Sequence, residues 1–256
     1  MTISAPSAIS YPVLNLSVVV PVHNEAENIN PLLNEITATF SAYPNYEIIY
    51  IDDGSTDNTL EILKAAQQTI PNLRVFHHEK SCGQSAAIYT GIKAAKFPVI
   101  ATLDGDGQNC PHDILRLHWY LQKDQREDNP KLAMIAGWRN QRNDSAWRLF
   151  SSKFANSIRS KLLGDATPDT GCGLKVFLRD AALQLPFFDH YHRFLPALML
   201  RSGYQVVSVP VTHRARERGV SNYGTLDRLW VGISDIAGVI WLKTRMKLTE
   251  VNEIER

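Results

Sequence analysis

The sequence predicts an α/β fold in which a mainly parallel sheet is flanked by helices. From Leu16 onward, short apolar runs alternate with longer segments of helical period, which is typical of repeated strand–helix–strand units. The chain has 256 residues, of which 44% are hydrophobic and 21% charged, so it can bury a core without a disulfide or zinc staple. We therefore expect one globular domain with a C-terminal appendage.

Five strands are predicted in the first part of the chain, and a helix joins each strand to the next. The expected strands are Leu16–Val22, Tyr46–Ile51, Leu73–Phe76, Pro98–Leu103 and Lys131–Ala136. The expected helices are Asn28–Phe40, Asp57–Gln67, Gln84–Ala95 and Pro111–Lys123. Asp57 and Pro111 are residue types that commonly begin helices. This order favours parallel strands.

The pattern is less regular after Gly137. We expect a basic loop, a long helix near 146–163, a Gly-rich turn at 169–173, a helix at 193–201, a strand at 205–211 and a second basic loop at 213–224. The predicted organisation is a flexible tail at 1–15, one domain at 16–224 and a C-terminal amphipathic helix at 225–256.

The C-terminal helix has two interpretations. Its apolar residues recur at helical spacing and are followed by cations. They are Leu226, Leu229, Trp230, Ile233, Ile236, Ala237, Ile240 and Trp241, followed by Lys243, Arg245 and Lys247. Tryptophans and trailing cations favour a membrane interface with anionic headgroups. The alternative is an apolar stripe packed on the protein's own core, and both can hold on different faces.

Composition excludes several classes of function. The formal net charge of +1 gives no global field for nucleic acid, so anion sites must come from local clusters. The three cysteines contain no C-x-x-C pair, which argues against a disulfide framework and a zinc site and favours a cytoplasmic setting. The chain lacks a signal-peptide pattern and an uninterrupted apolar run of roughly 18 to 20 residues, so we expect at most peripheral contact with the cytoplasmic membrane face. No pattern indicates an oligomeric state.

Three polar loops, at residues 21–25, 52–55 and 104–108, follow predicted strands, where ligands bind in open sheets of this kind. The sharpest is the acidic loop, in which Asp104, Asp106 and Gln108 alternate with other residues. In an extended segment such residues face the same way, so all three can meet one Mg²⁺ or Mn²⁺ ion. The alternative is a solvated acidic turn. A calcium loop of the EF-hand type requires Gly at its sixth position and Glu at its twelfth. It is excluded because this chain has Asn109 and Leu115 there.

The loop after the second strand carries Asp52 and Asp53. A carboxylate there can bind a nucleotide base or ribose, or it can belong to a turn with a helix cap at Ser55 or Asp57. The chain contains neither a G-x-x-x-x-G-K-[ST] loop nor a G-x-G-x-x-G fingerprint, so the usual phosphate cradles of kinases and dinucleotide enzymes are missing.

Four ordered blocks resemble glycosyltransferase family 2: LSVVVPVHNEAENI, IIYIDDGSTDNT, GQSAAIYTGIKAA and VIATLDGDGQNCP. More narrowly, the chain is similar to the dolichol-phosphate mannose synthases and their bacterial polyprenyl-phosphate glycosyltransferase relatives. The resemblance covers roughly residues 16–224. It implies a GT-A fold with a Rossmann-like sheet, an inverting reaction, and a divalent metal that bridges the phosphates of a nucleotide-diphosphate sugar.

The resemblance also implies roles for individual residues. Pro21, His23, Glu25 and Asp53 match positions around the nucleoside, and Asp104, Asp106 and Gln108 match positions that meet the metal and the pyrophosphate. His23 replaces a tyrosine that is common in close relatives, which leaves the identity of the base open.

Two basic groups suit two anions, one on the donor and one on the acceptor. The first contains Arg139, Arg142, Arg148 and Lys153, and the second contains His213, Arg214, Arg216 and Arg218. By resemblance, Arg139, the 148–156 stretch and residues 216–222 handle phosphates. Asn222 stands where those enzymes often have lysine, so a phosphate contact there loses its charge. The alternative is a solvated basic face.

The leading hypothesis is transfer of a hexose from a GDP- or UDP-sugar to polyprenyl (dolichyl or undecaprenyl) phosphate. We expect Asp104, Asp106, Arg139 and Arg216 to act in catalysis, and Arg148 and Lys153 to help bind the donor. A phosphate acceptor is already anionic and needs no general base. A second hypothesis, transfer to a sugar hydroxyl, requires a base such as Asp169. The third is a metal- or nucleotide-binding module without turnover.

Overall fold

The structure, a computed structural model, describes residues 15–126, 129–139, 159–160, 162–215 and 227–245. Its centre is a seven-stranded sheet with the strand order β3-β2-β1-β4-β6-β5-β7. The strands are β1 (Leu16–Val22), β2 (Tyr46–Asp52), β3 (Leu73–His77), β4 (Val99–Thr102), β5 (Leu132–Arg139), β6 (Lys175–Leu178) and β7 (Gln205–Val211). The helices are α1 (Ala26–Phe40), α2 (Thr59–Gln67), α3 (Gln84–Ala94), α4 (His112–Arg126), α6 (Arg179–Leu183), η1 (Tyr191–Arg193), α7 (Leu195–Arg201) and α8 (Asp227–Arg245).

The strand–helix alternation predicted for the first part of the chain is confirmed. Strands β1 to β5 and helices α1 to α4 occur in the expected order, with ends shifted by at most three residues. β3, β2, β1 and β4 pair in parallel, and every residue of β1 is buried. A strand that is buried on both faces reads as a continuous apolar run, which is why LSVVVPV is recognisable in the sequence.

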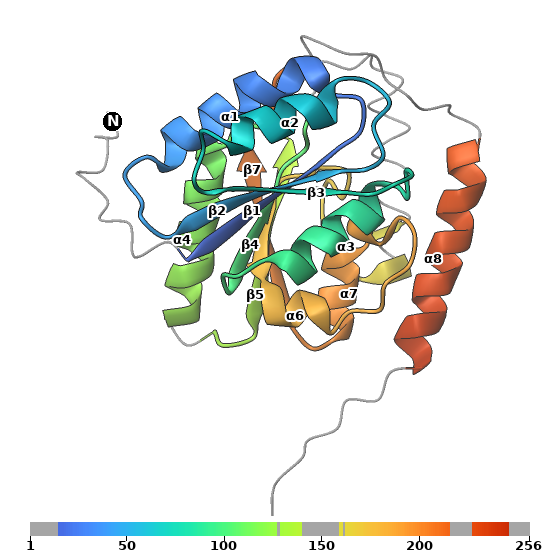
Figure 1. Ribbon diagram of the computed structural model, residues 1–256. Helices are drawn as coiled ribbons and strands as arrows, with labels where there is room; N and C mark the ends of the chain where they lie inside the picture. The colour runs from blue at the N-terminus through green and yellow to red at the C-terminus, as the bar shows by residue number, and fades with distance from the viewer. Residues whose placement is uncertain (1–14, 127–128, 140–158, 161, 216–226, 246–256) are drawn as a thin grey trace, which may run out of the picture.

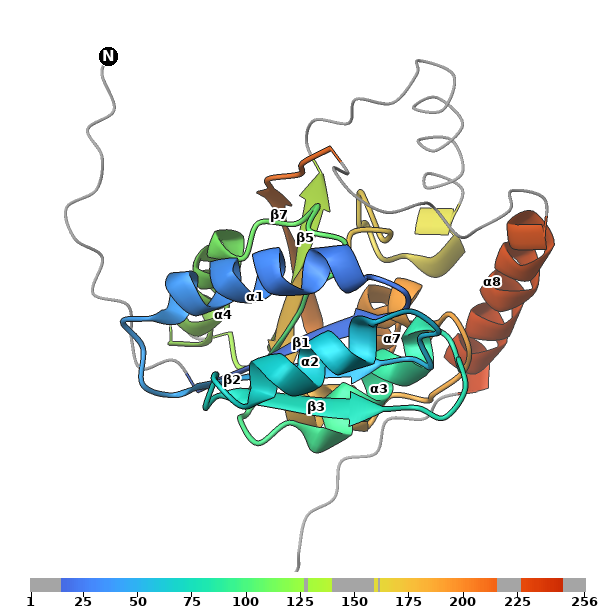
Figure 2. The same cartoon turned by 45° about the horizontal axis from the view of Figure 1, so that its top comes forward.

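Helices cover both faces of the sheet (Figures 1 and 2). Successive residues of a strand point to opposite faces, so Val18 belongs to the same buried cluster as Leu33 of α1 and Leu117 of α4, whereas Val19 belongs to the cluster that contains Ile92 of α3. Helices α1, α2 and α4 therefore form one outer layer. Helices α3, α6 and α7 form the other, and the sheet lies between two apolar cores.

The sequence pattern did not indicate strand β6. It runs antiparallel between β4 and β5, with Thr102 opposite Lys175 on one side and Ala136 opposite Lys175 on the other. Four residues with a lysine at the start are too few to give a clear strand signal. The consequence for the site is direct, because β6 brings the turn at 169–173 beside the loop that follows β4.

The C-terminal part is confirmed only in places. The strand expected at 205–211 is β7, whereas the helix expected at 193–201 begins at Leu195 and follows the short 3-10 helix η1. The helix expected at 146–163 lies largely outside the described residues; positions 159–160 and 162–163 are helical. The tail at 1–15 is described only at Asn15.

Helix α8 packs against the second core and also exposes apolar side chains. Val239 is 1% exposed, and Ile236, Ile240 and Leu242 contact the core cluster. In contrast, Ile233 is 51% and Trp241 58% exposed. Packing on the protein's own core is confirmed for the inner side, but a simple division into an apolar inner and a polar outer side is not observed. Among the described helices, none is long and apolar enough to cross a membrane.

Candidate functional site

The three polar loops lie at one edge of the sheet, because β1, β2 and β4 are parallel. The loops after β1 and β2 are fastened to each other through Asn24. Its backbone NH donates to Ser55 Oγ (2.9 Å), and its Oδ1 accepts from the Thr56 NH (2.7 Å). Asn24 has φ = 55°, a left-handed conformation that asparagine tolerates better than most residues. These contacts fix the entrance to α1 relative to the entrance to α2.

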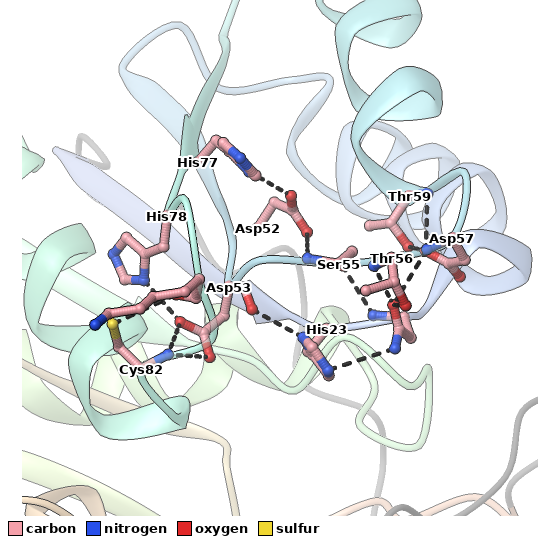
Figure 3. Close-up of polar contacts among 12 residues, drawn as sticks. His23, Asp52, Asp53, Ser55, Thr56, Asp57, Thr59, His77, His78 and Cys82 are labelled. Atoms are coloured by element: carbon pink, nitrogen blue, oxygen red, sulfur yellow. Dashed lines mark hydrogen bonds and ion pairs between the residues drawn. The ribbon is translucent and has the colours of Figure 1, made fainter.

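The predicted nucleoside residues of the first loop lie beside this junction. His23 Nδ1 donates to the Asp53 carbonyl oxygen (2.8 Å; Figure 3), and Glu25 Oε2 accepts from Asn28 Nδ2 (2.6 Å). Pro21 is buried within β1, beyond the last β1–β4 pair, where a proline costs no ladder hydrogen bond to β4. His23 and Asp53 are thus brought together, with Glu25 two residues further along the same loop, and their contact with a nucleoside stays a prediction.

The Asp53 carboxylate is surrounded by donors from the segment between β3 and α3 (Figure 3). Its Oδ1 accepts from His78 Nδ1 (2.7 Å) and the Cys82 NH (2.9 Å), and its Oδ2 accepts from Ser81 Oγ (2.8 Å) and the Gly83 NH (2.8 Å). Burial alone raises the pKa of Asp53, but the hydrogen bonds outweigh it and hold the pKa below its usual value. Asp53 is therefore ionised and built into the scaffold.

The neighbouring carboxylates show that the turn interpretation of this loop also holds. Asp52 accepts from His77 Nδ1 (2.7 Å) and from the Ser55 NH (3.3 Å; Figure 3). Asp57 Oδ1 accepts from the Thr59 NH (3.0 Å), the first residue of α2. The predicted start signal at Asp57 therefore acts two residues before the helix.

The acidic loop after β4 presents a different environment. Asp104 Oδ1 accepts from Gln84 Nε2 (2.9 Å), and its Oδ2 accepts from Asn109 Nδ2 (3.3 Å). Burial and the negative charge of Asp106 raise the pKa of Asp104, and the positive charges of Lys175 and Arg139 offset them only in part. Two carboxylates that repel each other at a sheet edge have the chemistry of a divalent-cation site that binds through oxygen.

Gly173 allows this arrangement. A Cβ atom at position 173 would lie 2.2 Å from the carboxylate atoms of Asp104, a distance that no side chain can occupy. The Gly173 carbonyl oxygen also accepts from Thr102 Oγ1 (2.6 Å). The turn before β6 therefore packs directly on the Asp104 side chain.

Gln108 is the third predicted metal ligand, and its side chain contacts the loop after β7. Its backbone NH donates to Asp106 Oδ1 (3.1 Å), whereas its side-chain Nε2 donates to the Arg214 carbonyl oxygen (3.2 Å). The Arg214 guanidinium pairs with both oxygens of Glu35 in α1 (2.6 and 2.9 Å). Arg214 thus fastens the loop after β7 to α1 through a bidentate ion pair. The role of Gln108 as a ligand stays a prediction.

Arg139 at the end of β5 is bound to Asp169. Its Nε and Nη2 donate to the two carboxylate oxygens (2.6 and 2.9 Å), which is the bidentate geometry that guanidinium also forms with phosphate. The structure therefore places Arg139 beside the acidic loop, near enough for its charge to lower the pKa of Asp104.

Five residues of the predicted basic groups (Arg142, Arg148, Lys153, Arg216 and Arg218) lie outside the described residues, as does Asn222. Their assignment to donor or acceptor phosphates stays a prediction.

Three residues near Asp104 were not singled out from the sequence. Gln84 begins α3 within a block that resembles the family, and Asn109 directly follows the acidic triplet. Lys175 is 3% exposed and donates from Nζ to the Cys172 carbonyl oxygen. Burial lowers the pKa of this ammonium group, while Cys172 and Asp104 act to raise it. The signal that could have found it is a lysine inside an otherwise apolar run.

Comparison with solved structures establishes the fold. The glucosyl-3-phosphoglycerate synthase of Mycobacterium tuberculosis, in complex with UDP, superposes with a TM-score of 0.62 at 17% identity, over 92% of this chain and 82% of that one. The mannosyltransferase PcManGT of Pyrobaculum calidifontis, in complex with GDP-Man and Mn²⁺, gives a TM-score of 0.60 at 20% identity, over 90% of this chain and 64% of that one. The expected GT-A architecture is thereby confirmed.

Closer sequence similarity is found among curated proteins. The dodecaprenyl-phosphate galacturonate synthase of Rhizobium johnstonii is 36% identical over 89% of this chain and 67% of its own length. The undecaprenyl-phosphate 4-deoxy-4-formamido-L-arabinose transferase of Edwardsiella ictaluri is 33% identical over 82% of this chain and 63% of its own length. The chain thus spans about two thirds of the length of these relatives. Because the model of glycosyl transferase family 2 also matches residues 17–185, this chain belongs to that family.

Proposed function

We propose that this chain transfers a hexose from a GDP- or UDP-sugar to a polyprenyl phosphate, with inversion at the anomeric carbon. The two curated relatives support the acceptor, since both are named for a polyprenyl phosphate. The solved neighbours support the donor class, since they hold UDP or GDP-Man.

The Arg139–Asp169 pair carries the choice of acceptor. A sugar hydroxyl needs a general base, and Asp169 is the carboxylate expected to supply one. In the structure both of its oxygens already accept hydrogen bonds from Arg139 (2.6 and 2.9 Å), so the carboxylate is paired with a guanidinium rather than directed at an acceptor hydroxyl. An acceptor phosphate is anionic near neutral pH and needs no proton removed. Arg139 lies beside the acidic loop, and the guanidinium hydrogens that do not face Asp169 can orient this phosphate.

Asp104 and Asp106 are the residues that would hold a Mg²⁺ or Mn²⁺ ion. Their mutual repulsion, which helps to raise the pKa of Asp104, is the electrostatic condition that a divalent cation relieves. When bound, such an ion stabilises the negative charge on the departing nucleoside diphosphate. Gln84 and Asn109 keep the Asp104 carboxylate in place through their amide groups.

The remaining residues bind and orient. His23, Glu25 and Asp53 form the wall that we assign to the nucleoside, with Pro21 beneath them in β1. Arg148, Lys153 and Arg216 complete the proposal as phosphate contacts. The acceptor oxygen attacks the anomeric carbon from the side opposite the leaving diphosphate.

The test is an assay with labelled nucleotide sugars and three acceptors in detergent: polyprenyl phosphate, the same polyprenol without phosphate, and a soluble glycan. The donor panel includes UDP- and GDP-hexoses and a galacturonate donor, because one relative is named for that sugar. We expect label in the organic phase only with polyprenyl phosphate, lost with chelator and restored by Mn²⁺ or Mg²⁺. Label on the glycan would support the hydroxyl alternative, and the absence of any turnover would support the binding-module alternative.

We also propose that the chain works at the cytoplasmic face of a membrane, where a polyprenyl phosphate would be delivered. The exposed Ile233 and Trp241 of α8 support peripheral attachment. Co-sedimentation with anionic vesicles tests this, and we expect Trp241→Ser to reduce the bound fraction. Equal sedimentation of the variant and the unmodified protein would contradict it.

A further inference from the structure

We propose that Asp53, His78 and Cys82 form a zinc site that is separate from the acidic loop. Asp53 directly follows β2, His78 directly follows β3, and Cys82 lies in the segment before α3. Their ligand atoms, a carboxylate oxygen, a ring nitrogen and a thiol sulfur, all lie within 4.8 Å of one another (Figure 3). Ligands of one tetrahedral zinc ion are separated by roughly 3.5 Å, given zinc–ligand bonds of about 2.0–2.3 Å, so small side-chain movements suffice.

The surrounding contacts resemble the outer shell of a metal site. A metal-bound histidine usually bonds a fixed partner through its other ring nitrogen, and His78 Nε2 lies 3.0 Å from Thr90 Oγ1. A metal-bound carboxylate is usually hydrogen-bonded as well, and Asp53 Oδ2 accepts from Ser81 Oγ and the Gly83 NH. Cys82 is exposed, which gives an ion a path from solvent. The site thus has ligands, orientation and access.

The chemistry of the ligands selects zinc over the hard cations. One sulfur and one imidazole nitrogen favour Zn²⁺, whereas the oxygen ligands of Asp104 and Asp106 favour Mg²⁺ or Mn²⁺. The sequence argued against zinc because no two cysteines are paired. The folded chain supplies the missing ligands from the residues directly after β2 and β3, which cysteine spacing alone cannot reveal.

Zinc binding changes the protonation of two of the three ligands. Asp53 is ionised and can only accept, so His78 Nδ1 carries the proton of their hydrogen bond. When zinc replaces that bond, the proton leaves Nδ1 and Nε2 takes one up and donates to Thr90 Oγ1, so the ring stays neutral. The Cys82 thiol loses its proton to become the thiolate ligand. One proton is released for each zinc ion bound.

Occupancy has a consequence for the proposed transferase. Zinc would bind the Asp53 carboxylate and change its position, and Asp53 belongs to the wall that we assign to the nucleoside. This consequence, inhibition of donor binding, rests on the proposed function. Metal binding itself does not, and it can be measured with no nucleotide present.

The test is a titration of the metal-free protein with Co²⁺, a spectroscopic substitute for zinc, after saturation of the acidic loop with Mn²⁺. We expect a thiolate-to-cobalt charge-transfer band that saturates at one ion per chain and disappears when Zn²⁺ is added, with one proton released per ion. Cys82→Ser removes the band, whereas Cys110→Ser, the matched control at another cysteine, keeps it. His78→Asn, whose amide NH₂ can take the place of Nδ1 and so retain a donor toward Asp53, weakens Co²⁺ binding at least tenfold.

Absence of the band in the unmodified protein, or its persistence in Cys82→Ser, would overturn the zinc site. Because no sugar donor is used, a protein that fails as a transferase can still show the band. An active transferase without the band refutes only the zinc site.

Discussion

Asp53 and Asp104 follow two parallel strands at the same edge of the sheet, yet their surroundings have opposite effects. Asp53 accepts hydrogen bonds from His78, Ser81 and two backbone NH groups, which lower its pKa. Asp104 accepts from two amides but is repelled by Asp106, and its pKa is raised. The protein surrounds the Asp53 carboxylate with hydrogen-bond donors, whereas the Asp104 carboxylate faces a second negative charge.

The two carboxylates therefore have different roles, one in the stability of the fold and one in readiness for a ligand. Asp53 stabilises the folded chain and orders the segment before α3. The acidic loop is electrostatically unfavourable in the metal-free protein, which is the usual condition of a group kept ready for a ligand. Substitutions at the two places should therefore move activity and stability differently.

The largest expected effect is on activity at the acidic loop. Asp106→Ala should lower kcat by about 10²-fold or more, since loss of a metal ligand removes several kcal/mol of transition-state stabilisation. The measurement is transfer of labelled sugar to polyprenyl phosphate at saturating Mn²⁺. Asp180→Asn is the control, because that side chain is 86% exposed and has no part in the proposed reaction. Equal rates for Asp106→Ala and the control would refute the assignment.

The second effect is on stability at Asp53. Asp53→Asn replaces an acceptor by an amide whose NH₂ group faces NH donors, so we expect the free energy of unfolding to fall by about 2–3 kcal/mol. Urea denaturation measures it. The same change at Asp106, Asp106→Asn, should not destabilise the metal-free protein, because it removes a repulsion. If both variants lose equal stability, the contrast between the two carboxylates is wrong.

A third prediction concerns the support of Asp104. Gln84→Ala removes the amide that donates to Asp104 Oδ1, and loss of such an outer-shell contact typically costs about 10–100-fold in metal affinity or activity. Dependence of the rate on Mn²⁺ concentration measures it. Gln67→Ala, at an exposed position of α2, is the matched control and should leave that dependence unchanged.

The smallest effect is on pH dependence. The pKa of Asp104 is raised in the folded chain. At a pH between its ordinary pKa and this raised pKa, Asp104 is therefore protonated in the folded chain but already ionised in the unfolded chain. The contribution of Asp104 to the free energy of unfolding of the metal-free protein is therefore fully present below its ordinary pKa. It decreases as the pH rises from the ordinary to the raised pKa. Asp53 acts with the opposite sign, and its contribution is lost as pH falls. In thermal melts with chelator, the melting temperature of Asp106→Asn should decrease less steeply with rising pH than that of the unmodified protein. An identical pH profile in the two proteins would argue against the repulsion between Asp104 and Asp106.

Much of the fold could be predicted because β1, β2 and β4 are buried almost throughout and the helices between the strands have clear apolar periodicity. The acidic loop was recognisable for a similar reason, since Asp104 and Asp106 lie close in sequence. Arg214 was grouped with phosphate-binding residues, but it pairs with Glu35, which is 179 positions away. Contacts such as Arg214–Glu35 and His78–Asp53 depend on which strands become neighbours, and the spacing of residue types carries no such information.

Strand β6 gives the chain an unusual order of assembly. β5 precedes β6 in the sequence but lies outside it in the sheet, so the edge of β4 stays unpaired until residue 178 has been synthesised. Gly173 and Lys175 reach Asp104 only at that moment. A nascent chain that ends before β6 would have an open sheet edge and an acidic loop without these contacts. The surroundings of Asp104 are therefore completed late in translation, when β6 pairs with β4 and ahead of β7, which follows in the sequence and pairs with β5.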